Sequence, residues 1–361
     1  MKKYVLPLVL LMTFSIGAQQ PASAPVPELP FETVMTIDGR NMPPGLYLGE
    51  VAGVAVNSKG HVFAYSRTGS PGGQLMGMRA AQLFEFDASG KFIKEIGQNL
   101  FSMGWAHSVK IDKDDNIWIV DNGTHMLTKF DSSGHALIAI GRRQESVQGP
   151  LAHDAPPVQW RFNEPTDIAW DSKGNSYISD GYANSRVAKL DKDGHWVKAW
   201  GEKGSAPGQF STPHSIAVYD DLVYVADRGN ERIQVFDTEG KFIRQISSLP
   251  RQVTTPPSPT LPIYGMGKRA DGTDNPLWPA AMCITPGPNP VMYTADYNPG
   301  RIYKSTLDGK LIGVFGQQGL KIGQLGHPHN ITCPAENEVY TGENRTWRIQ
   351  KIRVSVPKQS R

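Results

Sequence analysis

The chain has 361 residues, enough for two ordinary domains or one array of repeats. It carries 37 Lys and Arg against 34 Asp and Glu, a net charge of +3, and the basic residues are scattered. This pattern argues against a nucleic-acid-binding protein, which needs basic residues clustered on one surface.

Residues 1–18 (MKKYVLPLVLLMTFSIGA) have two lysines, an apolar run and then the small residues Gly17 and Ala18. This order predicts a signal peptide. The run is short for a membrane span, although an uncleaved anchor is the alternative. No later stretch is apolar enough for a membrane helix, so we expect a secreted or periplasmic protein without a membrane span in the mature chain. Residues 19–30 are rich in Pro, Ala and Ser and predict a tether, which leaves 31–361 for the folded domain.

Three segments that begin at His107, Thr166 and His214 repeat one pattern. Each reads as an alternating strand, a polar turn, a second strand ending in Asp, a Gly/Asn loop, a third strand and a turn before a fourth. Weaker copies begin at Ala52, near Ala281 and at His329. Four strands in a unit of about 40 to 60 residues are typical of a propeller blade. The sequence therefore predicts an all-β, six-bladed β-propeller.

The sixth unit ends after Ile352 with only three strands. The early segment 31–38 (FETVMTID) can supply the fourth, which would close the ring without a bare sheet edge. Three long insertions rich in Gly and Pro, at 68–81, 142–159 and 247–276, are expected to form loops on one face.

The two cysteines lie in the last two units. An oxidising compartment would allow them to pair. In the repeat register, however, Cys283 stands one position before the equivalent of Cys333. Since successive strand residues face opposite sides of a sheet, we expect the two side chains to point apart rather than form a disulfide.

When the six units are aligned on the first residue of each that is expected to be buried, equivalent positions of the units can be compared. These anchors are Val54, Val109, Ile168, Ile216, Met282 and Ile331. Two residues before them stand Ala52, His107, Thr166, His214, Ala280 and His329. Histidine thus occurs at this position in alternate units only. Alternate blades of six are related by about 120°, so the three imidazoles should converge on the propeller axis. Three neutral imidazoles around an open position are typical of a catalytic zinc site, although iron or cobalt would also suit them.

An acidic position recurs about twelve residues after the anchor, and the members are Ser66, Asp121, Asp180, Asp227, Asp296 and Glu343. We interpret it as structural, because an Asp at the end of a strand commonly accepts hydrogen bonds from the following loop. The residues just after it break the repeat, with Arg67, Tyr182 and Arg228 where other units have mostly small or amide residues. Taken singly, each histidine, the tyrosine and each arginine has an ordinary structural interpretation. Together they could bind a carboxylate, ionise a hydroxyl on a metal and transfer a proton through the phenol.

Four segments, QWRFNEPTDIAW, SDGYANSRV, WGEKGSAPGQFSTPHSIAV and VADRGNERIQVF, resemble the peptidyl-α-hydroxyglycine α-amidating lyase family of NHL-repeat propellers. The resemblance implies cleavage of a carbinolamide N–C bond to give an amide and glyoxylate, from a small-molecule or peptide substrate that carries a carboxylate. The residues it implies are zinc ligands at WAHSV, TPHSI and HPHNI, a catalytic tyrosine at SDGYANSR, and arginines at ADRGNER and AYSRTGS. In this chain they are His107, His214, His329, Tyr182, Arg228 and Arg67.

The chain departs from the family pattern at three places. Asn330 stands where the family has an aspartate that binds a structural calcium, so calcium is not expected. His327 replaces a methionine and would alter the pocket wall or offer a spare ligand. Ala183 replaces a cysteine, so the family's disulfide at that position is missing.

Two other functions remain open from the sequence. One is another metal-dependent reaction at the same site, such as lactone or ester hydrolysis. The other is a non-catalytic NHL propeller for ligand binding or protein interaction. We expect the protein to be a monomer.

Overall fold

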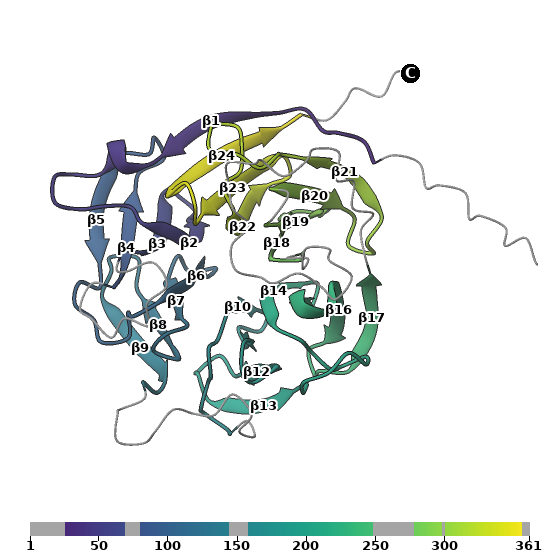
Figure 1. The fold of residues 1–361 in the computed structure, drawn as a ribbon. Helices are drawn as coiled ribbons and strands as arrows, with labels where there is room; N and C mark the ends of the chain where they lie inside the picture. Colours follow the sequence, from purple (N-terminus) through teal and green to yellow (C-terminus); the bar gives the residue numbers. More distant parts are fainter. Residues whose placement is uncertain (1–25, 69–79, 144–157, 248–277, 298–299, 356–361) are drawn as a thin grey trace, which may run out of the picture.

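The computed structural model describes residues 26–68, 80–143, 158–247, 278–297 and 300–355. Six four-stranded antiparallel sheets stand around a common axis (Figure 1), so the predicted six-bladed propeller is confirmed. The predicted signal peptide and nearly all of the three insertions lie outside the described residues. None of the helices in the described part of the chain has the length and apolar character needed to cross a membrane.

The blades follow one another in chain order, and each runs from an innermost to an outermost strand. Blades one and two consist of β2 (Glu50–Val56), β3 (Val62–Arg67), β4 (Ala81–Phe86), β5 (Phe92–Ile96), β6 (Ala106–Ile111), β7 (Ile117–Asp121), β8 (Met126–Phe130) and β9 (Ala136–Gly141). Blades three and four consist of β10 (Asp167–Trp170), β11 (Ser176–Asp180), β12 (Arg186–Leu190), β13 (Trp196–Trp200), β14 (Pro213–Tyr219), β15 (Leu222–Asp227), β16 (Arg232–Asp237) and β17 (Phe242–Ser247). Blades five and six consist of β18 (Ala281–Ile284), β19 (Met292–Asp296), β20 (Arg301–Ser305), β21 (Leu311–Phe315), β22 (Pro328–Ala335), β23 (Glu338–Glu343), β24 (Arg348–Val354) and β1 (Phe31–Ile37). Two single-turn 3-10 helices are η1 (Gly39–Asn41) and η3 (Arg228–Asn230).

The ring is closed by strands from the two ends of the chain, as predicted. β1 pairs antiparallel with β24, from Phe31 opposite Val354 to Ile37 opposite Ile349. In Figure 1 the first and last colours of the chain meet in this blade. Residues 26–30, at the end of the predicted tether, run beside β21, where Leu29 N donates to Val314 O at 2.8 Å. The outer edge of blade five is thereby covered, and β1 completes blade six.

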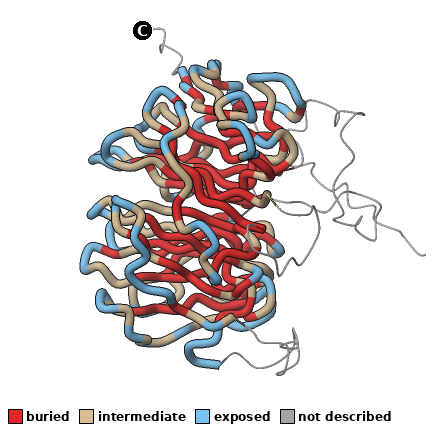
Figure 2. The backbone as a smooth tube through the Cα atoms, turned by 90° about the vertical axis from the view of Figure 1, so that its left-hand side faces the viewer, coloured by how far each residue is buried: buried red, intermediate tan, exposed pale blue. Residues whose placement is uncertain are grey.

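The core consists of the layers between adjacent blades. The inner strands are buried along most of their length, and exposure rises toward the outermost strands and the turns (Figure 2). Each blade packs one side against the blade before it and the other side against the blade after it. In β18, for example, Met282 packs with Tyr224 of blade four, whereas Ala281 packs with Ile331 of blade six.

This packing corrects our expectation for the cysteines. Cys283 and Cys333 form a disulfide between blades five and six, with their Cα atoms 5.9 Å apart. They do occupy positions of opposite parity. However, where two neighbouring sheets face each other, a residue at an odd position of the repeat on one sheet packs against a residue at an even position on the other, as Ala281 and Ile331 do. The prediction was wrong because it applied the alternation rule of one strand to side chains on two different sheets.

The acidic position is structural, as expected. Asp121 accepts hydrogen bonds from Gly104 N and Trp105 N, both at 2.9 Å. In blade four, Asp227 accepts from Ser211 N at 2.7 Å and pairs with Arg232 at 2.9 Å. These buried carboxylates hold the loop that leads into each innermost strand, and so they fix where the strand begins.

Candidate metal centre

The three histidines predicted to converge do so. The ring centroids of His107 and His214 lie 4.7 Å apart, those of His107 and His329 4.9 Å, and those of His214 and His329 5.3 Å. All three residues are buried, with at most 5 % of their surface exposed. One ring nitrogen from each lies within 4.8 Å of the other two. The imidazoles from blades two, four and six therefore form one compact group on the axis.

A β-bulge places each histidine. In β6 the pairing with β7 shifts between Ala106 and Ser108, so His107 is the extra residue of the pair. The pairing of β14 shifts around His214 and that of β22 around His329 in the same way. A bulge redirects its extra side chain away from the regular pleat. Here it accounts for three side chains aimed at the axis from the start of three innermost strands.

Backbone carbonyls of the following blades fix the orientation of each ring. The Nδ1 atom of His107 lies 2.6 Å from Thr166 O, that of His214 2.6 Å from Ala280 O, and that of His329 2.8 Å from Ala52 O. A carbonyl can only accept, so Nδ1 carries the proton in all three rings and Nε2 keeps its lone pair. This arrangement is typical of metal-bound histidines, whose second nitrogen is held by a neighbouring acceptor.

The surroundings keep these imidazoles neutral. Burial, followed by the charge of Arg67, holds the pKa of His107 and of His329 well below the ordinary value. Burial and the charge of Arg228 do the same for His214. The Nε2 atom of His107 is buried and has no hydrogen-bond partner. A buried polar atom of this kind is rare without a ligand, and a lone pair aimed into a group of imidazoles suits a divalent metal.

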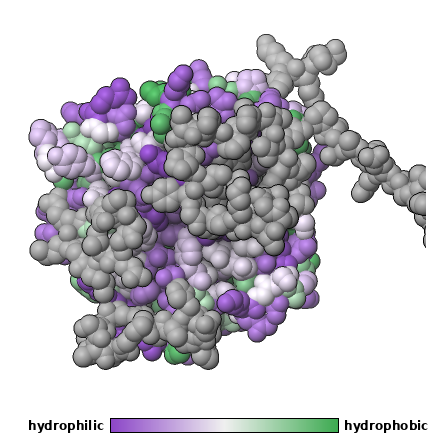
Figure 3. Space-filling model, in the orientation of Figure 1, coloured by the Kyte–Doolittle hydropathy of each residue, from purple (hydrophilic) through white to green (hydrophobic). Residues whose placement is uncertain are grey.

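A phenol and a guanidinium stand beside this group. The hydroxyl of Tyr182 lies 2.9 Å from Nε2 of His214, and Nη1 of Arg228 lies 3.5 Å from that hydroxyl. Arg228 is 6 % exposed and forms no ion pair with a carboxylate among the residues that the structure describes. Tyr182 is 37 % exposed and so reaches solvent. The described surface visible around the ring centre is largely hydrophilic (Figure 3). The site can therefore meet a polar, anionic ligand.

Comparisons with known proteins agree with this picture. The NHL repeat family matches residues 210–236. The chain is 34% identical over 229 residues to the peptidylglycine alpha-amidating monooxygenase of Rattus norvegicus, which covers 56% of this chain and 22% of the rat protein. It is 30% identical over 210 residues to a probable peptidyl-alpha-hydroxyglycine alpha-amidating lyase of Caenorhabditis elegans, with 54% and 57% of the two chains covered. The chain is a six-bladed propeller that contains an NHL repeat and is similar in sequence to amidating lyases over about half of its length.

The match to these relatives is partial in length, because the chain covers about a fifth of the rat protein and just over half of the nematode one. Relatives named as lyases support an enzyme of the amidating-lyase type. A solved virginiamycin B lyase from Staphylococcus aureus aligns with a TM-score of 0.55 at 13% identity, over 90% of this chain and 100% of that one. At that identity the likeness shows the propeller fold alone.

Arg67, the arginine of AYSRTGS, is more constrained than Arg228. Its Nε donates to Ala106 O at 2.8 Å, and its Nη1 pairs with Glu50 at 3.2 Å. The guanidinium also lies over the ring of Trp105, 4.6 Å from the centroid. Arg67 thus packs against the residues that precede His107, and part of its hydrogen-bonding capacity is already used.

Sequence reasoning missed Tyr297 as a member of the site. Its hydroxyl lies 3.5 Å from Nε2 of His214, and its ring stacks on His329 with centroids 5.5 Å apart. Burial raises the pKa of this phenol, so it stays protonated and acts as a donor. Tyr297 directly follows the acidic position, as Arg67 and Arg228 do, and that shared position was the available signal. His327, which departs from the family pattern, lies against Tyr297 with the two ring centroids 4.1 Å apart.

Proposed function

We propose that the chain is a zinc-dependent lyase that cleaves a peptidyl-α-hydroxyglycine, or a similar N-acyl carbinolamide, into an amide and glyoxylate. The observation that carries the proposal is the placement of the Tyr182 hydroxyl beside three convergent, neutral imidazoles, with the Arg228 guanidinium next to it. The relatives named as amidating lyases supply the reaction type.

His107, His214 and His329 would hold the zinc through Nε2. Such an ion supplies Lewis acidity, which lowers the pKa of a bound hydroxyl. A set of three imidazoles leaves one position open for that hydroxyl. The carbonyl partners of the Nδ1 atoms keep the rings in the tautomer that this role requires.

Tyr182, in its phenolate form beside Arg228, would take the proton of the α-hydroxyl and then, as the phenol, return it to the amide nitrogen. As the C–O bond becomes the carbonyl of glyoxylate, the C–N bond breaks and the amide nitrogen gains a proton, so no water is consumed. The phenol lies within reach of both events because it borders the imidazole group and remains partly exposed. A positioned acid or base of this kind contributes about 10²–10⁴-fold to a rate.

Arg228 would bind the carboxylate of the substrate. It is buried next to two phenols and lacks a described carboxylate partner, so an incoming carboxylate would satisfy it. A guanidinium binds a carboxylate through two parallel N–H groups, which also fixes orientation. Arg67 would add positive potential, while its own contacts to Glu50 and Ala106 hold the loop before His107.

The test measures bound metal together with glyoxylate release from an α-hydroxyglycine peptide. We expect about one zinc per chain, turnover that is lost on chelation and restored by zinc, and no turnover by His214→Ala. The matched control is His61→Ala, because His61 bonds Glu85 on the outer part of blade one, away from the axis. Full turnover by a rigorously metal-free protein would refute the proposal, and product from lactones alone would favour a hydrolase.

We also propose that residues 1–18 direct export of the protein. The support is the order of charged, apolar and small residues, together with a disulfide, which persists in oxidising compartments.

A further inference from the structure

A second layer of side chains lies on the axis, one position along the innermost strands from the histidines. Its members are Gly53, Ser108, Asp167, Ser215, Ala281 and Asn330. The strands approach closely here, since a Cβ on Gly53 would lie 2.6 Å from Val109 N. Asp167 is the single carboxylate of the layer and is 1% exposed. A buried carboxylate requires hydrogen bonds and a nearby positive charge.

The hydrogen bonds to Asp167 come from the blades on either side. Its Oδ1 accepts from Ser108 Oγ at 2.7 Å, and its Oδ2 accepts from Ser215 Oγ at 2.9 Å and Ile216 N at 3.2 Å. Ser108 and Ser215 directly follow His107 and His214. The carboxylate therefore connects two of the histidine-bearing strands through blade three.

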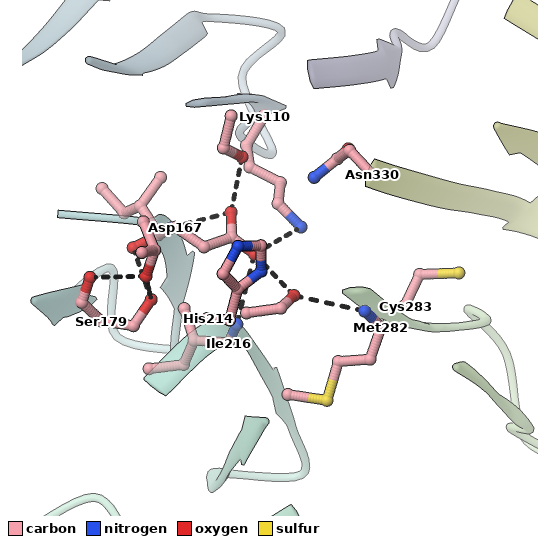
Figure 4. A network of polar contacts seen from close by, with 12 residues as sticks. Lys110, Asp167, Ser179, His214, Ile216, Met282, Cys283 and Asn330 are labelled. Atoms are coloured by element: carbon pink, nitrogen blue, oxygen red, sulfur yellow. Dashed lines mark hydrogen bonds and ion pairs between the residues drawn. The ribbon is translucent and has the colours of Figure 1, made fainter. Parts of the chain in front are cut away.

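The positive charge comes from the chain itself. Nζ of Lys110 lies 3.2 Å from Oδ2 of Asp167, and the Lys110 side chain is 19% exposed. In Figure 4 Lys110 extends from its strand toward Asp167, and the amide of Asn330 points into the same central space. The ammonium thus lies against the one carboxylate of the layer.

These residues do not fit a calcium ion at this position. Calcium prefers six to eight oxygen ligands with carboxylates among them. Asn330, which stands at the family's aspartate position, is neutral, and its Oδ1 already accepts from Val54 N at 3.2 Å. The remaining carboxylate, Asp167, is paired with an ammonium.

We propose that Lys110 is a built-in replacement for an axial divalent cation. Its ammonium neutralises Asp167 and holds blades two, three and four together beneath the metal centre. The protein is consequently independent of calcium for its stability. Removal of the ammonium opens a divalent-cation site in the layer, and an aspartate at position 330 supplies the second carboxylate for it.

The experiment compares unfolding midpoints of the zinc-loaded protein with and without millimolar calcium chloride. The variants are Lys110→Ala, Lys110→Ala combined with Asn330→Asp, and the control Lys189→Ala. Lys189 is likewise a lysine in an ion pair, with Glu239 at 2.8 Å, but it lies on β12 away from the axis. Midpoints report stability and not turnover, so the outcome is independent of the proposed reaction.

We expect calcium to leave the midpoint of the native protein unchanged. Lys110→Ala should unfold several degrees lower, and calcium should raise the midpoint of the double variant by about 3 °C or more, as expected for a bound ligand. Lys189→Ala should show no calcium response. A calcium-dependent rise for the native protein, or no rise for the double variant, would overturn the proposal. If the variants fail to fold, titration calorimetry of the native protein decides, because tight calcium binding contradicts an axis filled by lysine.

Discussion

The even-numbered and odd-numbered blades make different contributions at the axis. Blades two, four and six each present a histidine on a bulge. At the equivalent position, blades one, three and five present the backbone carbonyls of Ala52, Thr166 and Ala280, which orient those histidines. A backbone carbonyl is available from any residue. A six-fold repeat can therefore build a three-fold ligand set by changing the side chain in every second copy only.

The odd blades add the other reactive side chains. Arg67, Tyr182 and Tyr297 come from blades one, three and five, and they follow the acidic position by one or two residues. Among the even blades, blade four adds Arg228 there. The proposed metal ligands and the proposed proton-transfer residue thus lie on different blades, so the two roles should be separable by substitution.

The largest expected effect comes from exchanging side chains at the histidine position. His107→Ala should lose bound zinc and reduce glyoxylate release to background, because one of three ligands is gone. Thr166→Ser, at the same position of blade three, should keep both the bound zinc and the glyoxylate release, because the backbone carbonyl and a side-chain hydroxyl remain. Metal content and turnover measured side by side test this, and a Thr166→Ser variant without zinc would contradict the division between blades.

The next largest effect is a difference in kcat between variants of the two tyrosines, Tyr182 and Tyr297, on the odd blades. Tyr182→Phe should retain zinc but lower kcat about 10²–10⁴-fold, because the hydroxyl 2.9 Å from His214 is the proposed base. Tyr297→Phe should cost much less, about tenfold, because its phenol is a buried donor. Steady-state kinetics on the two zinc-loaded variants provide the comparison. Equal losses would mean that the roles of the two phenols cannot be distinguished.

The smallest effect concerns blade six, which carries a second histidine, His327, that is partly buried. Burial, followed by the charge of Arg345, lowers the pKa of His327 to about 3. The unfolded chain would bind a proton near pH 6.5 while the folded chain would not. The stability from this group is therefore complete above pH 6.5 and is lost as the pH falls toward 3, by about 1.4 kcal/mol per pH unit.

Urea unfolding of the metal-free protein between pH 7 and pH 4 measures that slope. His327→Met should reduce the slope of unfolding free energy against pH by the amount that corresponds to about one bound proton. The control His195→Gln should leave the slope unchanged, because His195 is exposed in a hairpin turn. Identical slopes for the native protein and His327→Met would show that another group dominates acid unfolding.

The sequence predicted the fold and the histidine cluster because both depend on repetition. The anchor residues recur often enough to align six units, and the alternation of His107, His214 and His329 stands out against them. The closing strand was predictable because an incomplete sixth unit needed a partner, which β1 supplies.

Features that depend on contacts between blades were not predictable in the same way. The disulfide joins residues on facing sides of two sheets, so the parity within one strand gave the wrong answer. Tyr297 reads as a packed aromatic until its hydroxyl is seen beside His214. Lys110 and Asp167 belong to neighbouring blades, and the sequence of neither strand alone predicts their ion pair.

Because β1 and β24 close the ring, the cluster of three histidines depends on strands from distant parts of the chain. The third imidazole, that of His329, belongs to blade six. The strand that completes this blade is β1, and Thr33 of β1 donates a hydrogen bond to Gln350 of β24 across a separation of 317 residues. A chain that stopped short of β24 would leave β1 unpaired and blade six unsupported. Blade six is complete only when both β1 and β24 are present, so we expect chains that lack either strand to lose the three-histidine cluster.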